Sequence, residues 1–344
     1  MPKKLLLVGS NSSIAHVKSY YNLVKDYFDE VLVVTNVPIE YCEFKLVDFS
    51  LKNPFKVYTS IKRMRYIMKE FAPSIIHVHQ AAAYSYITAR ANLTQLPLVV
   101  TAWGSDVLIL PHRNFMYRHI VKFSLRKADY LTADAHYMAD EIKKMVNKEV
   151  LVANFGIEYT EEEIPDKKKV IYSNRLHNPL YRVDQIIIGF AEFYKRNKEW
   201  KLIIGANGSE TETLKKLASS LLPPTAYEFI GFVSQEINKQ WYLDSKIWIS
   251  YPESDGTAIS LLEAMGYGCI PVTSDLPANR EWIKEGENGQ IVTNKIEKSM
   301  ELAAQMNSTT VQNLNKNIIR QQATKRVNKK KFETLYDSIF TVEK

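Results

Sequence analysis

The sequence contains little cysteine and no long apolar segment. Its two cysteines, Cys42 and Cys269, lie too far apart for a metal-binding or redox motif, so they are expected to be free thiols in a reducing compartment. No apolar run approaches the roughly 18 residues that a membrane-spanning helix needs. The apolar stretch near the start, residues 5–8, is too short for the core of a signal peptide. Together these absences predict a cytoplasmic protein.

Two common ligand motifs are also missing. The turn that begins at Gly9 and Ser10, after the first predicted strand, has no G-x-G-x-x-G fingerprint, which counts against a nicotinamide-dependent dehydrogenase. The chain has no D-x-D pair either. His77 and His79 share one face of a predicted strand, but no obvious third metal ligand accompanies them. We therefore expect no metal site.

The overall composition is typical of a globular protein. Of the 344 residues, 46% are apolar and 24% are charged, and the chain is long enough for two domains of ordinary size. The formal net charge of +7 favours anionic partners such as nucleotide phosphates or a lipid surface. We expect no nucleic-acid partner.

The most informative stretch covers residues 251–292. A short apolar strand leads into a polar turn with Asp255 and Gly256, and a helix is predicted to begin near Thr257. Backbone amides at the start of a helix carry partial positive charge and suit a phosphate group. Glu263, further along this helix, suits sugar hydroxyls because a carboxylate accepts hydrogen bonds from adjacent OH groups. The stretch therefore predicts a site for a nucleotide or a nucleotide-sugar.

The same residues carry a family resemblance. The run D-G-T-A-I-S-L-L-E-A-M-G-Y-G, residues 255–268, resembles the E-x7-E region of the family 4 retaining glycosyltransferases, which have the GT-B fold. The family pattern is E-G-x-P-x-x-L-L-E-A-M-A-x-G-x-P-V, so Asp255 replaces the first Glu and Ala258 replaces the Pro, while the spacing of the two acids is kept. The resemblance implies that Asp255 binds sugar hydroxyls, that Glu263 binds the ribose, and that nearby backbone amides stabilise the departing diphosphate. These amides belong to Gly256, Thr257 and Ala258.

Further segments match the donor side of the family pattern. The run SNRLHNPLYRVDQIIIGFAEF, residues 173–193, resembles G-R-L-x-x-x-K-G-x-D-x-L-I-x-A-F, whose Arg and Lys hold the diphosphate. Arg175 matches the Arg of this pattern. The chain has one extra residue before the Lys position, where Tyr181 falls, and the neighbouring Arg182 is the alternative phosphate ligand. The loop that the resemblance places against the base contains Phe232 and Val233.

Two segments match the acceptor side. The loop that begins at Gly9 and Ser10 corresponds to the family's G-G-x-x-x-H loop near the acceptor, of which Gly9 and His16 are present. The segment T-A-W-G-S-D resembles T-x-H-G-x-D, whose His lies at the sugar; Trp103 occupies that position and Gly104 follows it. Trp103 either stacks on a sugar and shapes the cleft or simply packs. The predicted acceptor or sugar cleft therefore contains Gly9, Ser10, His16, Trp103 and Gly104.

The resemblance implies an α/β fold of the GT-B type, with two Rossmann-like domains that face a cleft. The first, acceptor-binding domain is expected to cover residues 1–165, and the charged run at residues 160–169 is typical of a linker. The second, donor-binding domain is expected to cover residues 166–325. Residues 326–344 are expected to form a helix that crosses back to the first domain.

The function that the resemblance implies is a retaining transfer of a sugar from a nucleoside-diphosphate sugar, UDP in preference to GDP, to a hydroxyl of a glycan or lipid-linked acceptor in surface polysaccharide synthesis. The nucleotide-sugar would be a substrate, so no cofactor is expected. The predicted catalytic residues are Asp255, Arg175 and Glu263. Three alternatives stay open, namely a sugar-nucleotide epimerase of the same fold, a dehydrogenase and a non-catalytic nucleotide-sugar binder.

Two predicted helices, residues 56–71 and 111–127, set aliphatic and aromatic residues against several lysines and arginines. This composition is typical of helices that lie in a membrane interface, although the apolar faces also suit packing on a sheet. We therefore expect the first domain to dock on the anionic inner face of the cell membrane, where a lipid-linked acceptor would lie.

Overall fold

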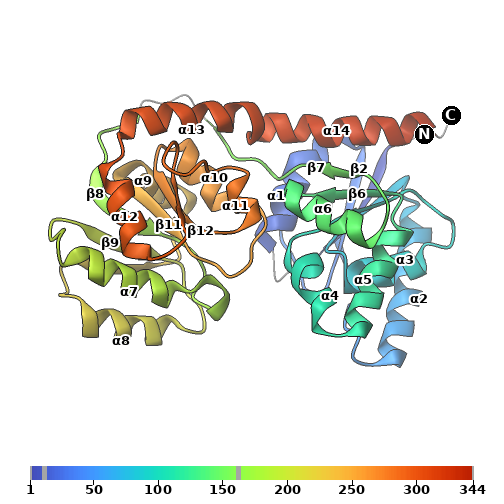
Figure 1. The fold of residues 1–344 in the computed structure, drawn as a ribbon. Coiled ribbons are helices and arrows are strands. Elements are labelled where there is room, and N and C mark those ends of the chain that lie inside the picture. The colour runs from blue at the N-terminus through green and yellow to red at the C-terminus, as the bar shows by residue number, and fades with distance from the viewer. Residues whose placement is uncertain (1, 10–13, 160–163, 343–344) are drawn as a thin grey trace. The chain divides into compact units, whose positions relative to one another are not determined.

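The computed structural model describes residues 2–9, 14–159 and 164–342 of the chain. The chain folds into two compact units (Figure 1). The first unit contains Met1–Phe155 and Lys325–Lys344, and the second contains Gly156–Thr324. The chain therefore leaves the first unit after Phe155 and returns to it in the terminal helix.

The first unit is built on a parallel sheet of seven strands in the order β3-β2-β1-β4-β5-β6-β7. Near-continuous apolar runs such as KLLLV in β1 explain why the central strands are buried on both faces, as parallel sheets require. The strand order reverses between β1 and β4, and ligands of doubly wound sheets bind at the carboxyl ends of the strands beside such a reversal. The strands are β1 (Lys4–Val8), β2 (Glu30–Thr35), β3 (Phe44–Leu46), β4 (Ile75–His79), β5 (Leu98–Thr101), β6 (Tyr130–Ala133) and β7 (Val150–Val152).

The helical elements of this unit are α1 (Ile14–Val24), a 3-10 turn at Lys25–Tyr27, α2 (Pro54–Phe71), α3 (Ala83–Ala91), a π-helical turn at Ser105–Ile109, α4 (Leu110–Arg113), α5 (Phe115–Lys127), α6 (His136–Met145) and α14 (Lys325–Val342). α1 and α14 pack on the sheet face that carries Leu5 and Leu7, and Phe332 of α14 belongs to this core. α3 packs on both α2 and α5, which places the three helices together on the opposite face, as right-handed crossovers require (Figure 1).

Polar side chains tie α14 to the sheet inside the first core. The hydroxyls of Tyr336 on α14 and Tyr20 on α1 both hydrogen-bond Nδ1 of His77 on β4, at 2.7 and 2.9 Å. His77 Nε2 bonds the Thr101 hydroxyl at 2.6 Å. All four side chains are buried, and burial lowers the pKa of His77 to about 3. His77 is therefore neutral near neutral pH, and both of its ring nitrogens are occupied by protein partners.

The second unit contains a parallel sheet of six strands in the order β10-β9-β8-β11-β12-β13, which reverses between β8 and β11. The strands are β8 (Lys168–Ser173), β9 (Lys201–Gly205), β10 (Tyr227–Gly231), β11 (Ser245–Ser250), β12 (Ile270–Ser274) and β13 (Gln290–Val292). The helical elements are a 3-10 turn at Pro179–Tyr181, α7 (Val183–Tyr194), α8 (Thr211–Leu221), α9 (Gln235–Asp244), α10 (Ile259–Gly266), α11 (Pro277–Arg280), α12 (Ile296–Gln305) and α13 (Ser308–Gln322).

Successive strand residues of the second sheet enter two separate cores, as the alternation of side chains along a strand requires. Ile171 and Ile247 pack with residues of α7, α8 and α12 on one face. Tyr172 and Trp248 pack with residues of α9, α10 and α13 on the other face. Both faces of the sheet are therefore covered, and its loops are left at the two ends of the strands (Figure 1).

The basic helix expected over residues 111–127 is interrupted. α4 ends at Arg113 and α5 begins at Phe115, because Asn114 between them has an extended backbone with φ −166°. The Asn114 side chain accepts a hydrogen bond from the Tyr117 amide at 3.0 Å and so caps α5. The prediction of one continuous helix was wrong because a cap residue can end one helix and begin the next without a proline or glycine.

The charged run at residues 160–169 is described only in part, since residues 160–163 lie outside the described residues. β8 already begins at Lys168 within this run. The expected domain boundary at residues 165 and 166 lies inside the second unit, and the one at residues 325 and 326 lies at the start of α14.

None of the helices in the described part of the chain combines the length and the apolar character that crossing a membrane requires.

Candidate active site

The carboxyl ends of β8 and β11 lie on either side of the strand-order reversal in the second sheet. Arg175 follows β8, and the loop with Asp255 follows β11 and leads into α10. This edge of the sheet is where doubly wound folds bind ligands. Two segments that are far apart in the sequence therefore meet where a ligand site is expected.

Arg175 and Asp255 form an ion pair at this edge. The distance from Arg175 Nη2 to Asp255 Oδ2 is 2.5 Å, and Arg175 Nη1 donates to the Ser260 hydroxyl at 2.9 Å. The guanidinium also lies 4.4 Å from the ring centroid of Tyr181. The Arg175 side chain is only 10% exposed and that of Asp255 22% exposed. Burial would lower the pKa of Arg175, but the neighbouring Asp255 and Tyr181 raise it above its ordinary value, so Arg175 stays a cation.

Arg182 stabilises the loop that follows β11 through hydrogen bonds. Its backbone is left-handed, with φ 46°, where the 3-10 turn ends and α7 begins. Nε donates to the Tyr251 carbonyl at 2.9 Å and Nη2 to the Pro252 carbonyl at 3.0 Å, while the guanidinium lies 4.1 Å from the Tyr251 ring centroid. Its donors are therefore directed to backbone carbonyls and hold the loop that carries Asp255.

The start of α10 presents its first-turn amides without a capping side chain. The helix expected from Thr257 begins at Ile259, because Ala258 is extended with ψ 121°. The loop before it is fixed by two hydrogen bonds, from the Gly256 amide to Asp255 Oδ1 at 3.1 Å and from Trp282 Nε1 to the Thr257 hydroxyl at 3.2 Å. A helix start of this kind favours an anion, because its amides carry partial positive charge.

Glu263 on α10 is oriented by a chain of buried polar groups. Trp248 Nε1 donates to Asn174 Oδ1 at 2.9 Å, and Asn174 Nδ2 donates to the Tyr242 hydroxyl at 2.7 Å. Tyr242 in turn donates to Glu263 Oε2 at 3.0 Å. Burial and the charge of Glu263 raise the pKa of Tyr242, so the phenol keeps its proton and remains the donor.

The residues predicted to line a base lie further along the same edge. Phe232 and Val233 follow β10, and β9 separates β10 from β8. The Phe232 side chain is 68% exposed, whereas Val233 is half-buried. Gly231 before them has φ 66°, a left-handed conformation that only glycine adopts easily.

Trp103 and two histidines form a cluster in the first unit. Trp103 Nε1 donates to His79 Nδ1 at 3.1 Å, and the Trp103 ring lies 5.1 Å from the exposed ring of His16. His79 is fully buried, which lowers its pKa far below the ordinary value, with smaller contributions from His77 and His16. Since His79 Nδ1 is the acceptor, its Nε2 carries the proton, and this buried N–H has no partner among the described residues.

The loops around this cluster are fixed by a buried acid. Asp106 accepts hydrogen bonds from the Ala81 amide at 2.6 Å and the Trp103 amide at 3.0 Å, which ties the loop after β4 to the loop after β5. Burial raises the pKa of Asp106, and these amides oppose that effect. Gly104, which lies between Trp103 and Asp106 in the sequence, has φ 109°, so a glycine is required there. Gly9 follows β1 and is buried, while Ser10 lies outside the described residues.

Several residues that shape the site were not singled out from the sequence as functional. Ser260 and Tyr181 hold Arg175, and Asn174 and Tyr242 orient Glu263. Tyr181 and Ser260 lie inside the two matched segments, where a search for aromatic and hydroxyl neighbours of Arg175 could have found them. Tyr242 lies in a helix without any motif, so no sequence signal marked it.

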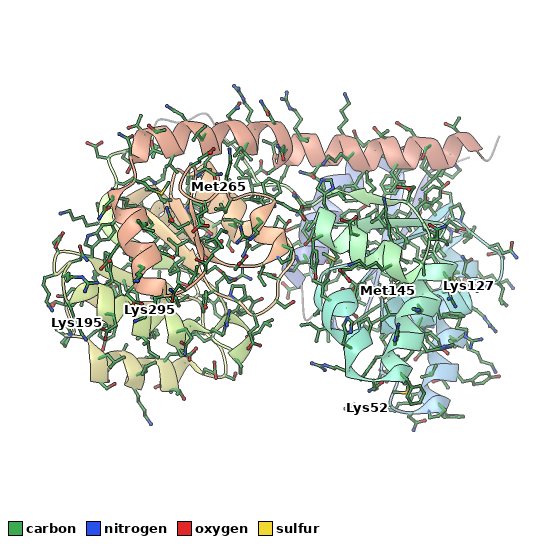
Figure 2. The ribbon with its side chains drawn as sticks, viewed as in Figure 1. Lys52, Lys127, Met145, Lys195, Met265 and Lys295 are labelled. Carbon is green, nitrogen blue, oxygen red and sulfur yellow. The ribbon has the colours of Figure 1, made fainter. Side chains whose placement is uncertain are left out.

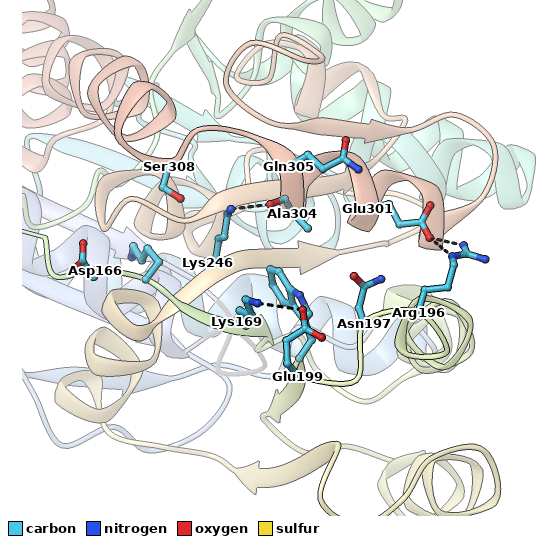
Figure 3. Close-up of a pocket in the computed structure, with 12 residues that line it drawn as sticks. Asp166, Lys169, Arg196, Asn197, Glu199, Lys246, Glu301, Ala304, Gln305 and Ser308 are labelled. Carbon is cyan, nitrogen blue, oxygen red and sulfur yellow. Dashed lines mark hydrogen bonds and ion pairs between the residues drawn. The ribbon is translucent and has the colours of Figure 1, made fainter.

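A separate pocket lies at the opposite, amino-terminal edge of the second sheet (Figure 3). Its charged residues are largely paired with each other. Lys169 bonds Glu199 at 3.1 Å, Arg196 pairs with Glu301, and Lys246 donates to the Ala304 carbonyl at 2.7 Å. This pocket therefore offers few unpaired charges to a ligand. Among the described residues, no group of three or more His, Cys, Asp or Glu side chains could hold a metal ion.

The chain has two doubly wound parallel sheets, and the second has a buried arginine and a helix start beside its strand-order reversal. This is the arrangement in which α/β proteins bind nucleotides. The family model described as "Glycosyl transferases group 1" matches residues 158–326, and the one described as "Glycosyl transferase 4-like" matches residues 4–135. The chain belongs to this family of glycosyltransferases.

Known relatives and solved structures agree with this assignment. A Bacillus subtilis protein named as a teichuronic acid biosynthesis glycosyltransferase, TuaC, is 24% identical over 261 residues, which cover 73% of this chain and 66% of that protein. A Rickettsia africae glycosyltransferase superposes with a TM-score of 0.79 and 15% identity over 98% of this chain and 99% of that one. Anabaena HepE in complex with UDP and glucose superposes with a TM-score of 0.80 and 15% identity over 98% of this chain and 100% of that one. These superpositions confirm the predicted GT-B fold.

Proposed function

We propose that this protein transfers a sugar from a nucleoside-diphosphate sugar, UDP in preference to GDP, to a hydroxyl of a glycan or lipid-linked acceptor, with retention at the anomeric carbon. The observation that carries the proposal is the buried cation Arg175 beside the start of α10 at the strand-order reversal. A cation and oriented amides in one partly buried place suit the charge that develops on a departing diphosphate.

The chemistry follows from this placement. The bond from the anomeric carbon to the β-phosphate oxygen breaks, and its electron pair goes to the diphosphate. Arg175 and the amides of Thr257 and Ala258 stabilise that negative charge, and the Gly256 amide joins them once it exchanges its bond to Asp255 Oδ1 for the diphosphate. The acceptor oxygen forms the new bond to the anomeric carbon and passes its proton to an oxygen of the departing diphosphate. Because the pKa of Arg175 lies above its ordinary value, the stabilising cation is present throughout the physiological pH range.

The two acids are proposed to bind the rest of the donor. Asp255 accepts hydrogen bonds from sugar hydroxyls, and Glu263 accepts them from the ribose. Tyr242 supports this role because it holds one carboxylate oxygen of Glu263 in place. Phe232 and Val233 lie against the base. Arg182 contributes indirectly, by holding the loop that carries Asp255.

The first unit is proposed to bind the acceptor. Gly9 follows β1 beside the strand-order reversal, Trp103 follows β5 at the same edge of the sheet, and the ring of His16 on α1 lies 5.1 Å from that of Trp103. Trp103 is held through His79, so its ring has a fixed orientation against which a sugar could stack. Docking of this unit on the inner, anionic face of the cell membrane forms part of the proposal, because a lipid-linked acceptor would present its hydroxyl there.

The names of related proteins support the choice of donor and pathway. HepE was solved with UDP and glucose, WaaB is named as a lipopolysaccharide outer core galactosyltransferase, and TuaC is named for teichuronic acid biosynthesis. These names favour a UDP-hexose donor and a role in surface polysaccharide synthesis.

The experiment is a thermal-shift panel of UDP-, GDP- and other nucleotide-sugars, followed by measurement of nucleotide release with and without glycan and lipid-linked acceptors. A UDP-hexose should raise the melting temperature, since a ligand that binds only the folded state stabilises it by mass action. Nucleotide release that requires an acceptor supports transfer. Conversion of the sugar without an acceptor would instead identify an epimerase, and binding without any turnover would identify a non-catalytic binder.

A further inference from the structure

A groove of about 1060 Å³ runs between α2, α3 and α5 on the face of the first sheet opposite α14. Four cations line it, namely Arg65, Arg90, Arg126 and Lys127. Asp129 is the acid among the lining residues, and its Oδ2 already accepts a hydrogen bond from the Leu98 amide at 2.9 Å. The groove is therefore strongly cationic.

The surrounding segment has a large excess of positive charge. Residues 49–128 contain twelve lysines and arginines but only two acids, Glu70 and Asp106, while the net charge of the whole chain is +7. Asp106 is fully buried and bonded to backbone amides, so it does not reach the surface. Lys52 and Lys127 lie near the two ends of this segment in the sequence, and both are labelled in Figure 2. The cations around the groove are thus hardly balanced by acids of the same segment.

Two arginines of the groove are arranged for an anion. The Arg90 guanidinium lies 5.0 Å from the ring centroid of Phe123 and 5.5 Å from that of Tyr86, which fixes its position. Arg65 Nη2 donates to the Arg90 carbonyl at 3.1 Å, whereas Arg65 Nε is buried and has no hydrogen-bond partner among the described residues. A buried donor of a charged group without a partner is unfavourable, so an acceptor oxygen from a ligand would satisfy it.

Exposed apolar side chains lie in the groove and on the helices that form it. Tyr58 and Leu93 line the groove and are 52% and 67% exposed. On α2, Phe55 and Tyr66 are 73% and 55% exposed, and Phe115 at the start of α5 is 88% exposed. Large apolar side chains interleaved with cations are the composition of a surface that enters a lipid interface, whereas a nucleic acid would require the cations but not the exposed Leu93.

We propose that this groove is the docking site for the phosphate of an anionic lipid in a bilayer, with Arg65, Arg90, Arg126 and Lys127 around the headgroup and with Tyr58 and Leu93 in the interface. The inference deepens the membrane docking proposed above by naming the site. It depends on no step of the proposed sugar transfer, whose donor site lies in the second unit.

The test is sedimentation of the full chain with vesicles of phosphatidylcholine that contain increasing amounts of phosphatidylglycerol. The variant Arg90→Gln/Arg126→Gln/Lys127→Gln removes three exposed groove cations without touching Arg65, whose hydrogen bond supports α3. Each cation near an anionic leaflet contributes about fivefold to partitioning, so the triple variant should partition about a hundredfold less. Binding of the wild type should also fall as salt is added, because salt screens this attraction.

The matched control is Lys198→Gln/Lys216→Gln/Lys298→Gln, which removes three exposed cations from the second unit and changes the net charge equally. This control should bind vesicles as the wild type does. A second variant, Tyr58→Ser/Leu93→Ser, keeps every charge and should weaken binding through lost apolar contact. Thermal stabilisation by a UDP-hexose serves as the readout of folding and of the proposed donor site.

Equal loss in the groove variant and the control would overturn the groove as the site, as would equal recovery of the wild type on neutral and anionic vesicles. Tight binding to RNA in the absence of vesicle binding would overturn the choice of a lipid. In each case an intact response to the UDP-hexose would leave the proposed transferase function standing.

Discussion

Arg175 combines a buried guanidinium with an acidic partner, a hydroxyl and an aromatic ring. In the proposed function it binds the diphosphate, and Glu263 binds the ribose. We predict that Arg175→Ala and Glu263→Ala each weaken the binding of a UDP-hexose by about 1.5–3 kcal/mol, the range for a hydrogen bond to a charged group. Isothermal titration calorimetry measures this change directly.

The control for these two variants is Arg196→Ala, which removes an exposed arginine at the opposite edge of the same sheet and breaks only its ion pair with Glu301. Its affinity for the UDP-hexose should match that of the wild type. Unchanged affinity of both Arg175→Ala and Glu263→Ala would show that the donor does not bind at this edge of the second sheet.

His77 makes the stability of the first unit depend on pH. Its pKa is about 3 in the folded chain because burial disfavours the charged ring, and its ordinary value is 6.5. Below about pH 6.5 the unfolded chain therefore takes up a proton that the folded chain does not, and stability decreases as pH falls toward 3. The full slope is about 1.4 kcal/mol per pH unit, and His79, whose pKa is also lowered by burial, adds a decrease of the same sign.

We predict that the free energy of unfolding, followed by the fluorescence of Trp103 in the first unit, decreases between about pH 7 and about pH 5. Tryptophan-to-phenylalanine replacements in the second unit isolate this signal. The variant His77→Gln cannot take up the proton and should show a shallower slope. The same slope in His77→Gln and in the parent would contradict the assignment of the pH dependence to this histidine.

α14 is attached to the first core by both packing and buried polar contacts. Tyr336 is fully buried, packs in the first core, and bonds Nδ1 of His77 at 2.7 Å. We predict that Tyr336→Ala lowers the free energy of unfolding of the first unit by about 3–5 kcal/mol, because it leaves a cavity. Tyr336→Phe keeps the packing and should cost only about 1 kcal/mol for the lost hydrogen bond.

Chemical denaturation of the two variants separates these contributions. The control is Ser338→Ala on the same helix, where the exposed hydroxyl bonds only the Leu335 carbonyl one turn earlier, so its effect should lie within about 0.5 kcal/mol. A Tyr336→Ala variant as stable as Ser338→Ala would mean that α14 contributes nothing to the first core.

The strands and the order of elements could be predicted from the sequence because apolar runs such as KLLLV and IWIS leave no alternative to a buried strand. The helix interruption at Asn114 could not, since asparagine is common within polar helix faces and acts as a cap only when the backbone around it is extended. Arg182 is a similar case. Its left-handed φ of 46° depends on tertiary bonds to the Tyr251 and Pro252 carbonyls, which no local pattern indicates.

At the scale of the molecule, the candidate site could be located from sequence because its two main segments each carry a motif of fixed spacing. The structure brings Arg175 and Asp255 into contact, although eighty positions separate them. Asn174 and Tyr242, which orient Glu263, could not be predicted. Their contribution comes from where the sheet and α9 place them, and that is a property of packing rather than of sequence pattern.

The charge balance of the whole protein–donor complex decides whether the transfer needs a metal ion. A departing diphosphate needs compensating positive charge, which a divalent metal supplies in many enzymes. Here Arg175 stays charged, because Asp255 and Tyr181 raise its pKa, and the first-turn amides of α10 add partial positive charge beside it. We therefore predict that binding of a UDP-hexose and acceptor-dependent release of UDP both survive an excess of EDTA. Added Mg²⁺ should not restore affinity to Arg175→Ala, since the missing charge belongs to the protein. Loss of UDP release in EDTA that Mn²⁺ or Mg²⁺ restores in the wild type would show instead that a metal carries the charge.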